Sequence, residues 1–537
     1  MNRGYLCIVL HAHLPYVHHP EHDRFFEENW LFEAITECYL PLIEVLERLE
    51  RDGVACRLTV SLSPTLMTML QDALLQQRYI RHLEQRLQLA DQEKRRTRHQ
   101  PALHRLADGY QRAFLVALDR YKQHYQCDLL APFAHHAKTG RLELITTAAT
   151  HGFLPLLNVS EAAVISQIET GIDCFRRYFG FRPAGFWLPE CAYYLGVERL
   201  LQRAGIRYFF VDSHGLLDAK PTPQKGVYAP IDCGNGVMAL GRDPACSRQV
   251  WSADQGYPGD AAYREYHRDI GFDLPLADMA PYLLNDGSRI STGIKYYRVT
   301  GKTEDKALYQ PDQAQARARQ HARDFIDKRR QQVDALHPAL HGPPLIVAPY
   351  DAELFGHWWF EGPVWLESVL RIAAETGSPV KTLTVSDYLA RHPKHAIAHM
   401  QQSTWGDQGY ADYWLNASND WIYPLLHKAG AEMEKLARDI GGLPITALQE
   451  RALNQALRSL LLAQASDWPF ILRSGTTVDY AKQRIIDNLA RFNYLHDAIR
   501  KNRLDQRYLT ALEIMDDIFP DIDFRRFRPD TSGEVRS

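Results

Sequence analysis

Short apolar runs alternate with amphipathic stretches along most of the chain. Runs such as "YLCIVL" (5–10), "LELITTAA" (142–149) and "PPLIVAPY" (343–350) show little polar alternation, which is typical of parallel strands buried on both faces. Between them lie stretches such as "EAITECYLPLIEVLERLERDG" (33–53), where apolar residues recur at helical spacing and Gly53 ends the pattern. The alternation predicts an α/β fold with a parallel sheet.

Polar or ionisable residues follow several of these predicted strands directly. The residues that do so are His11, His151, Glu190, Asp212 and Asp351. The carboxyl ends of parallel strands meet at one face of a βα barrel, and that face carries the active site. The recurrence therefore predicts a TIM-like barrel with its chemistry at the strand ends.

Two stretches lack strand patterns and predict helical additions. We expect a helical insertion at 71–137 and a C-terminal helical domain at 401–537, with the catalytic barrel formed by 1–70 and 138–400. Within the barrel, the polar and aromatic segment 243–273 predicts a loop region that covers the active site.

Bulk properties narrow the class of protein. The chain has 537 residues, a net charge of −3 and a hydrophobic content of 45%, which gives no electrostatic reason to expect nucleic acid or an anionic membrane as partner. The eight cysteines are scattered without a CxxC pair, as expected in a reducing compartment. The first apolar run is too short for a signal peptide or a membrane span, so we expect a cytoplasmic protein.

Glu190 and Asp351 are the candidate catalytic pair. A single carboxylate at a strand end is most often a helix cap or an ion-pair partner, but these two share a setting. Each ends an apolar run, follows a proline-containing step and has aromatic neighbours in sequence. Two carboxylates on one barrel face suit the cleavage of a glycosidic bond, in which one attacks as an anion and the other supplies a proton.

His11 and His13 suggest two alternatives. On a strand their side chains point the same way, so they could bind a metal ion if His151, Asp212 or His214 supplied further ligands. They could instead donate hydrogen bonds to sugar hydroxyls, and we favour this second interpretation.

Five ordered motifs then give a resemblance. The sequences "HAHLPYV", "HGFLP", "WLPECAY", "PYDAELFGHWW" and "SDWPF" together resemble the motifs of the family 57 glycoside hydrolases, most closely those of its 1,4-α-glucan branching enzymes. The resemblance covers essentially the whole chain. It implies an incomplete (β/α)7 barrel with a helical insertion and a helical C-terminal domain. It also implies a retaining double displacement without metal or cofactor.

The same resemblance implies roles for individual residues. Glu190 would be the nucleophile and Asp351 the general acid/base. The residues lining the subsite of the attacked glucose would be His11, His13, His151 and Asp467. Arg289, in "DGSRISTGIKYYR", is a weaker candidate for a sugar contact.

Aromatic residues outside the motifs are further candidates. "YPGD" (257–260) has the residue order of a type II turn and would place Tyr257 at a projecting tip. In branching enzymes that this chain resembles, a tyrosine-tipped loop covers the cleft, so its presence favours a transferase. Trp405 is a candidate platform for a sugar ring, whereas Trp30 and Trp414 could equally join the helical domain to the barrel.

The leading hypothesis is a branching enzyme that cleaves an α-1,4 bond and passes the chain to a 6-hydroxyl during glycogen or α-glucan synthesis. Its partners would be α-glucan donor and acceptor chains. The alternatives are an α-amylase or 4-α-glucanotransferase of the same family, a metal-dependent polysaccharide deacetylase built on the histidine pair, and a non-catalytic glycan-binding protein.

Overall fold

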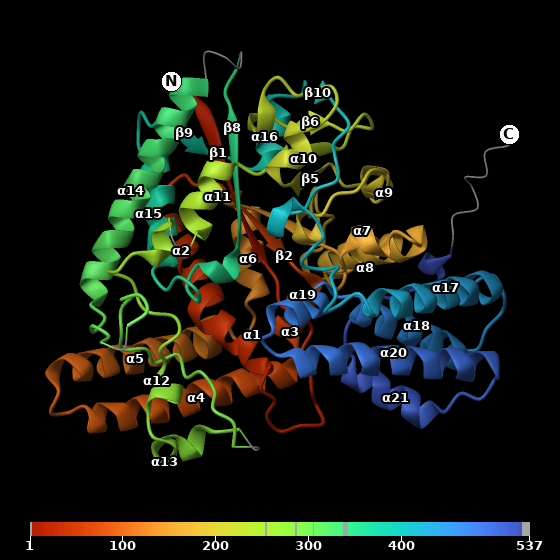
Figure 1. Ribbon diagram of the computed structural model, residues 1–537, viewed down its shortest axis with the longest axis horizontal. Coiled ribbons are helices and arrows are strands. Elements are labelled where there is room, and N and C mark those ends of the chain that lie inside the picture. Colours follow the sequence, from red (N-terminus) through yellow and green to blue (C-terminus); the bar gives the residue numbers. More distant parts are fainter. Residues whose placement is uncertain (1–2, 253–254, 285–286, 304, 337–341, 529–537) are drawn as a thin grey trace.

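The centre of the molecule is a strongly curved, mostly parallel sheet (Figure 1). The computed structural model describes residues 3–252, 255–284, 287–303, 305–336 and 342–528. In the order in which they pair around the sheet, its main strands are β8(Leu345–Asp351), β1(Gly4–Ala12), β2(Leu58–Leu62), β3(Leu142–Thr147), β4(Gly185–Trp187), β5(Tyr208–Val211) and β7(Met238–Gly241). These strands pair in parallel throughout.

The sheet curls into an incomplete ring, whose first and last strands, β8 and β7, approach each other without forming a ladder in the described residues. Just beyond β7, the Asp243 N–H donates a hydrogen bond to the carbonyl of Val347 in β8 at 2.8 Å. Three short strands lie outside this ring: β6(Ile231–Asp232), β9(Val380–Thr382) and β10(Ala396–Ile397). The ring of parallel strands is the incomplete (β/α)7 barrel predicted from the sequence, and that fold class is confirmed.

Local sequence explains why these segments form a barrel. Every residue of β1 is buried, so a continuous apolar run is what both of its faces require. Helices that cover the strands are amphipathic, and the first of the long ones ends before Gly53, whose φ is +67°. The helices around the barrel include α1(Glu28–Ala34), α2(Leu40–Arg51), α3(Pro64–Gln71), α7(Leu154–Leu157), α8(Glu161–Phe179), α9(Val197–Arg203), α10(Ser213–Leu217), α14(Pro311–Leu336), α15(Gly362–Ala374) and α16(Val385–Arg391).

Two groups of helices extend from the barrel in opposite directions (Figure 1). The stretch 71–137 folds as helices. The long antiparallel pair α4(Ala73–Arg96) and α5(Pro101–Asp119) extends outward, whereas the shorter α6(Leu130–Lys138) packs against β3 and α2 of the barrel. The C-terminal stretch forms a bundle, drawn in blue: α17(Ile422–Ile440), α18(Ala447–Ala463), α19(Asp467–Ser474), α20(Val478–Arg500) and α21(Gln506–Met515).

Behind the barrel mouth, three charged side chains form what we call the Glu37 cluster: Glu37, Arg264 and His357. Arg264 donates to Glu37 at 2.9 Å, and the other Glu37 oxygen lies 2.6 Å from His357 Nδ1. Gly356, beside His357, has φ +117°, and an added Cβ would lie 1.7 Å from the Glu37 carbonyl oxygen. The glycine of "LFGHWW" is therefore required by this close backbone approach.

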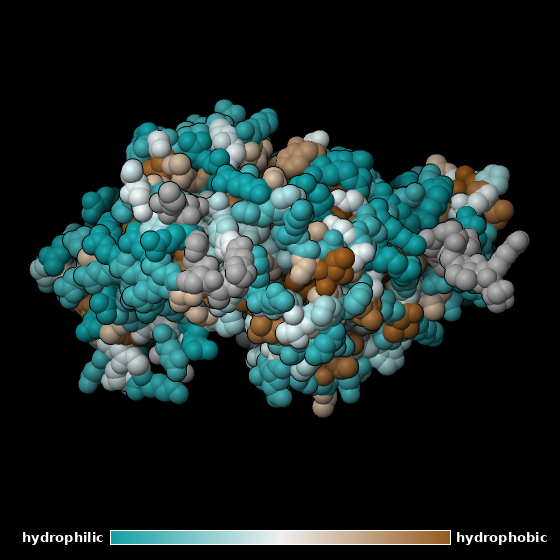
Figure 2. Space-filling view, turned by 90° about the horizontal axis from the view of Figure 1, so that it is seen from above, coloured by the Kyte–Doolittle hydropathy of each residue, from teal (hydrophilic) through white to brown (hydrophobic). Residues whose placement is uncertain are grey.

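The outer surface is mostly polar. The face in Figure 2 is predominantly hydrophilic, with hydrophobic side chains only in small groups. Within the described part of the chain, we find no helix with both the length and the apolar character needed to cross a membrane.

Candidate active site

A cavity of about 580 Å³ opens at the carboxyl ends of the barrel strands. Its walls combine histidines, carboxylates and aromatic rings: His11, His13, Leu14, His151, Glu190, Arg242, Trp251, Asp351, Glu353, Trp358, Trp405, Gly406, Asp407, Tyr413, Trp414, Asp467 and Phe470. The structure thus brings together residues from the barrel and from the C-terminal bundle. The volume and mixed lining of this cavity are typical of a small-molecule or glycan subsite.

Glu190 projects into this cavity from a strained turn after β4. Its backbone lies in the left-handed region, with φ 61° and ψ 22°, which costs a non-glycine residue on the order of 1–3 kcal/mol. The Trp405 N–H donates to the Glu190 carbonyl at 3.1 Å and helps hold this conformation. Such strain at a charged residue is characteristic of functional sites.

The Glu190 carboxylate is held by neutral donors. One oxygen accepts from the Trp405 indole N–H at 2.8 Å, and the other accepts from the Ser466 hydroxyl at 3.1 Å. Burial raises the pKa of Glu190 to about 7, although the hydrogen bond from Trp405 opposes the rise. The group therefore titrates near neutrality and can act as an anion without a permanently paired cation.

Asp351, the last residue of β8, lies beside β1 and faces the same cavity. Burial raises its pKa well above the ordinary value, and the charges of Glu353 and Glu190 add to the rise while Arg242 opposes it. Both carboxyl groups therefore have raised pKa values, as expected of a pair in which one member must hold a proton near neutral pH.

A chain of hydrogen bonds connects the histidines to Glu190. His11 Nε2 lies 3.0 Å from His151 Nε2, and His151 Nδ1 lies 2.8 Å from the Ser466 hydroxyl. Because burial lowers the pKa of both histidines, each carries one ring proton. Ser466 donates its proton to Glu190, so it must accept from His151 Nδ1–H.

The remaining positions in the chain then follow. His151 Nε2 carries no proton and accepts from His11 Nε2–H, so His11 Nδ1 accepts from the Ser61 hydroxyl, 3.1 Å away. All bonds in the chain point from Ser61 toward Glu190, and the ionised carboxylate fixes both tautomers.

His13 differs from its two neighbours because it has a carboxylate partner. Its Nε2 lies 3.1 Å from Asp467 at the start of α19. Burial alone would lower the pKa of His13, but the charge and hydrogen bond of Asp467 outweigh it and raise the pKa. His13 Nδ1 is buried without a hydrogen-bond partner among the described residues, so it is available to a substrate oxygen.

This arrangement argues against a metal ion at the histidine pair. His11 and His151 bind each other, and their rings stack with that of His13 at centroid distances of 4.0–5.8 Å. Asp212 and His214 do not join them, because Asp212 pairs with Arg242 at 2.8 Å and lies 3.3 Å from His214. The imidazoles therefore form a stacked hydrogen-bonded layer and do not converge on one point.

The predicted aromatic platforms occupy different places. Trp405 lines the cavity but also binds Glu190 directly, so it positions the carboxylate. Trp414 lines the cavity while stacked on Phe153 at 4.8 Å, and it is only 1% exposed. Trp30 packs edge-on against Tyr480 of α20 and belongs to the junction with the C-terminal bundle, outside the cavity lining.

Tyr257 does not project as predicted, and this prediction is wrong. Residues Tyr257–Gly259 form a 3-10 turn, and the Tyr257 ring is buried against α14, where its hydroxyl donates to Asp324 at 2.7 Å. The ring also stacks on His321 at 4.6 Å. The aromatic side chain of segment 243–273 that reaches the cavity is Trp251, which is 41% exposed.

Arg289 also lies away from the cavity. Its guanidinium donates to the carbonyls of Gly271 at 2.7 Å and Leu274 at 2.9 Å. It therefore satisfies the carbonyl groups at the end of α12(Ile270–Asp273). Its side chain holds this segment together and is not part of the cavity lining.

Three polar residues that lie close to the predicted site residues were missed in the sequence, and two of them, Glu353 and Arg242, line the cavity. Glu353 accepts from the His13 N–H at 3.2 Å and from the Tyr39 hydroxyl at 2.5 Å. Arg242 follows β7 directly, so the strand-end pattern could have identified it. Ser466 precedes Asp467 in the motif "SDWPF" but carries no signal of its own, because its role depends on contacts across the fold.

Comparisons with known proteins agree with this site and fold. A model of glycosyl hydrolase family 57 matches residues 7–401, and a model of the 1,4-alpha-glucan branching enzyme C-terminal region matches residues 425–527. A 1,4-alpha-glucan branching enzyme from Thermococcus kodakarensis is 32% identical and is covered over 77% of its length by 96% of this chain. A probable branching enzyme from Mycobacterium tuberculosis is 29% identical, with 97% of this chain and 98% of the relative covered.

Solved structures give the same family with two named activities. An α-amylase from Thermotoga maritima has a TM-score of 0.91 and 42% identity, over 98% of this chain and 99% of that one. A branching enzyme from Pyrococcus horikoshii has a TM-score of 0.88 and 33% identity, over 99% of this chain and 98% of that one. From its family-model match and its relatives, the chain belongs to glycosyl hydrolase family 57.

Proposed function

We propose that this protein is a 1,4-α-glucan branching enzyme. The observation that carries the proposal is the pair Glu190 and Asp351, two partly buried carboxyl groups with raised pKa values at the strand ends of one open cavity. The match of residues 425–527 to a branching-enzyme C-terminal region supports the transferase activity in particular.

In the first step, the Glu190 carboxylate attacks C1 of a glucose unit in an α-1,4-glucan. The C1–O4 bond breaks, a C1–Glu190 ester forms, and Asp351 gives its proton to the departing O4. The hydrogen bonds from Trp405 and Ser466 orient the attacking carboxylate. Asp351 is left ionised, ready to act as a base.

In the second step, a 6-hydroxyl of an acceptor chain resolves the ester. Asp351 removes the hydroxyl proton, O6 bonds to C1, and Glu190 leaves as a carboxylate. Two inversions at C1 give net retention, and both residues return to their starting states. The product carries an α-1,6 branch, as required for glycogen or a similar glucan made in the cytoplasm.

The cavity lining suits a neutral polysaccharide. Trp358 and Phe470 line it and are 54% and 43% exposed, respectively, so they offer apolar faces to the C–H surfaces of sugar rings. His13, with its free Nδ1, would contact a hydroxyl of the attacked glucose.

We propose that the chain is divided into a catalytic barrel of residues 1–70 and 138–400, a helical insertion of residues 71–137 and a C-terminal helical domain of residues 401–537.

The second candidate is an α-amylase, favoured by the 42% identity to a structure with that name. The two differ only in what resolves the ester, since water replaces the 6-hydroxyl. The burial of Tyr257 removes the expected tyrosine lid as an argument for the transferase.

Incubation with amylose separates these activities. Proton NMR of the product measures α-1,6 linkages, and a reducing-end assay measures hydrolysis. A branching enzyme yields more new α-1,6 linkages than new reducing ends. If reducing ends accumulate without α-1,6 signals, the protein is an amylase and the proposal fails.

A further inference from the structure

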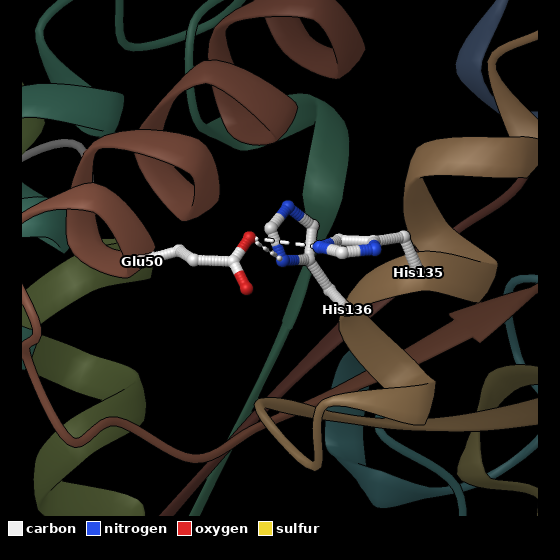
Figure 3. Close-up of side chains that lie close together, drawn as sticks. All are labelled: Glu50, His135 and His136. Carbon is white, nitrogen blue, oxygen red and sulfur yellow. Dashed lines mark hydrogen bonds and ion pairs between the residues drawn. The ribbon is translucent and has the colours of Figure 1, made fainter.

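A group of three side chains that could bind a metal ion lies away from the active-site cavity. Glu50, near the end of α2, faces His135 and His136 on α6 (Figure 3). Arg141, which contacts Glu50, directly precedes the first residue of β3. The group therefore lies at the amino-terminal side of the strands, the end of the barrel opposite the catalytic residues.

The ligand atoms of these three residues converge. One Glu50 oxygen, Oε2, is 2.9 Å from His135 Nε2 and 3.6 Å from His136 Nδ1. All three ligand atoms lie within 4.8 Å of one another. Ligands of a tetrahedral zinc ion are about 3.3–3.5 Å apart, given bond lengths of about 2.0–2.2 Å, so small side-chain rotations would complete the geometry.

The described residues do not satisfy the hydrogen-bonding groups of the buried His136 ring. It is only 1% exposed, yet neither ring nitrogen has a hydrogen-bond partner in the described part of the chain. Leaving a buried polar group unsatisfied is costly. Imidazole binds metal ions through an unprotonated ring nitrogen, so an ion would satisfy a nitrogen that the described residues leave unpaired.

The surroundings of Glu50 also suit a metal ligand. Its other oxygen, Oε1, accepts from Arg141 at 3.0 Å, and such an outer contact orients a ligating carboxylate. A surface cavity of about 390 Å³, lined by His124, Asp128 and the three residues, gives access from solvent. The exposed side of His135 leaves room for water as a fourth ligand.

We propose that Glu50, His135 and His136 bind a divalent transition-metal ion of the zinc type. Two imidazoles and one carboxylate match the ligands of zinc and exclude a preference for magnesium or calcium, which take oxygen ligands. The ion joins α2 of the barrel to α6 of the 71–137 stretch. Its role is to stabilise this junction, and it takes no part in catalysis.

The site can be tested with cobalt(II), whose visible absorption reports tetrahedral nitrogen and oxygen ligands. Untagged full-length protein is treated with a chelator, exchanged into metal-free buffer and titrated with Co²⁺. We expect one equivalent to bind with a new visible band. Zn²⁺ should remove this band and Mg²⁺ should not.

Substitutions test which residues bind the ion. His135→Ala and Glu50→Gln should each weaken Co²⁺ binding at least about 10-fold, whereas His99→Ala, an exposed histidine elsewhere in the 71–137 stretch, should bind as the parent does. His135 is exposed, so its replacement should leave the fold intact. Zn²⁺ should raise the melting temperature of the parent and of His99→Ala only.

Absence of a stoichiometric site, or equal Co²⁺ affinity in His135→Ala and the parent, would overturn the proposal. The measurement does not use glucan turnover, so its outcome is independent of whether the protein branches or hydrolyses its substrate.

Discussion

Two partly buried carboxylates near the barrel mouth behave in opposite ways. In the Glu37 cluster, burial disfavours the charge of Glu37, but the cations Arg264 and His357 outweigh burial and lower its pKa to about 2. In the cleft, Glu190 has only neutral donors, Trp405 and Ser466, within direct hydrogen-bonding contact, and its pKa rises to about 7. The fold thus holds one anion permanently charged and the other close to its titration point.

This difference separates a structural carboxylate from the one that we propose as the nucleophile. A paired anion such as Glu37 is a poor nucleophile, because its charge is neutralised by an arginine that cannot lose its proton. An anion held by neutral donors keeps its reactivity and its orientation. The partners of a buried carboxylate therefore distinguish the two roles better than its burial does.

The largest expected effect comes from replacing the unpaired carboxylate. Glu190→Gln keeps the size of the side chain but removes the attacking anion, so turnover should fall by about 10⁴-fold or more. The free energy of unfolding should not decrease, because no charge pair is broken. Turnover is measured with amylose, and glucan binding and denaturant unfolding serve as controls.

A fluorinated glucosyl donor that traps the ester should label Glu190 in the parent, as read by peptide mass spectrometry. Labelling of another residue, or substantial turnover by Glu190→Gln, would contradict its role as nucleophile.

The next effect concerns the paired carboxylate. Arg264→Met removes the main cation of the Glu37 cluster and leaves a buried anion with His357 alone, so the free energy of unfolding should fall by about 3–5 kcal/mol. Denaturant unfolding at neutral pH measures the change. Arg317→Met is the control, since it breaks a pair with Asp260 in which the arginine side chain is 45% exposed, and it should cost at most about 1 kcal/mol.

Equal effects of the two arginine substitutions would show that the Glu37 cluster does not stabilise the fold.

The smallest expected effect is a shift in the pH dependence of activity, caused by a substitution within the active-site cavity. Activity requires ionised Glu190, so kcat/KM should fall as the pH drops through about 7. The Trp405 hydrogen bond favours the ionised form, and Trp405→Phe should therefore move this acid limb upward by about one pH unit. Trp251→Phe, which changes another indole of the same cavity, should leave the limb in place.

A downward shift in Trp405→Phe, or the same shift in both tryptophan variants, would contradict the direct role of the indole N–H.

The barrel and the two carboxylates could be predicted from the sequence because their signals are local. Each buried strand is a continuous apolar run, and each functional group follows its strand within a few residues, as Glu190 and Asp351 do. Parallel strands then bring these positions together without further information.

Residues whose role depends on distant contacts could not be predicted in this way. "YPGD" has the order of a turn, but the burial of Tyr257 is decided by α14, which lies far along the chain. The importance of Ser466 likewise arises only when α19 meets His151 and Glu190. Tertiary packing overrode the local turn preference at Tyr257, and the sequence around Ser466 carried no local signal of its role.

The left-handed backbone conformation at Glu190 places the proposed nucleophile in the cavity but lowers the thermal stability of the fold. Glycine there would relieve both the unfavourable dihedral angles and the desolvated carboxyl group. We therefore expect the protein to melt at a lower temperature than its Glu190→Gly variant, which would lack the proposed nucleophile. Improvement of its thermal tolerance must come from elsewhere in the fold.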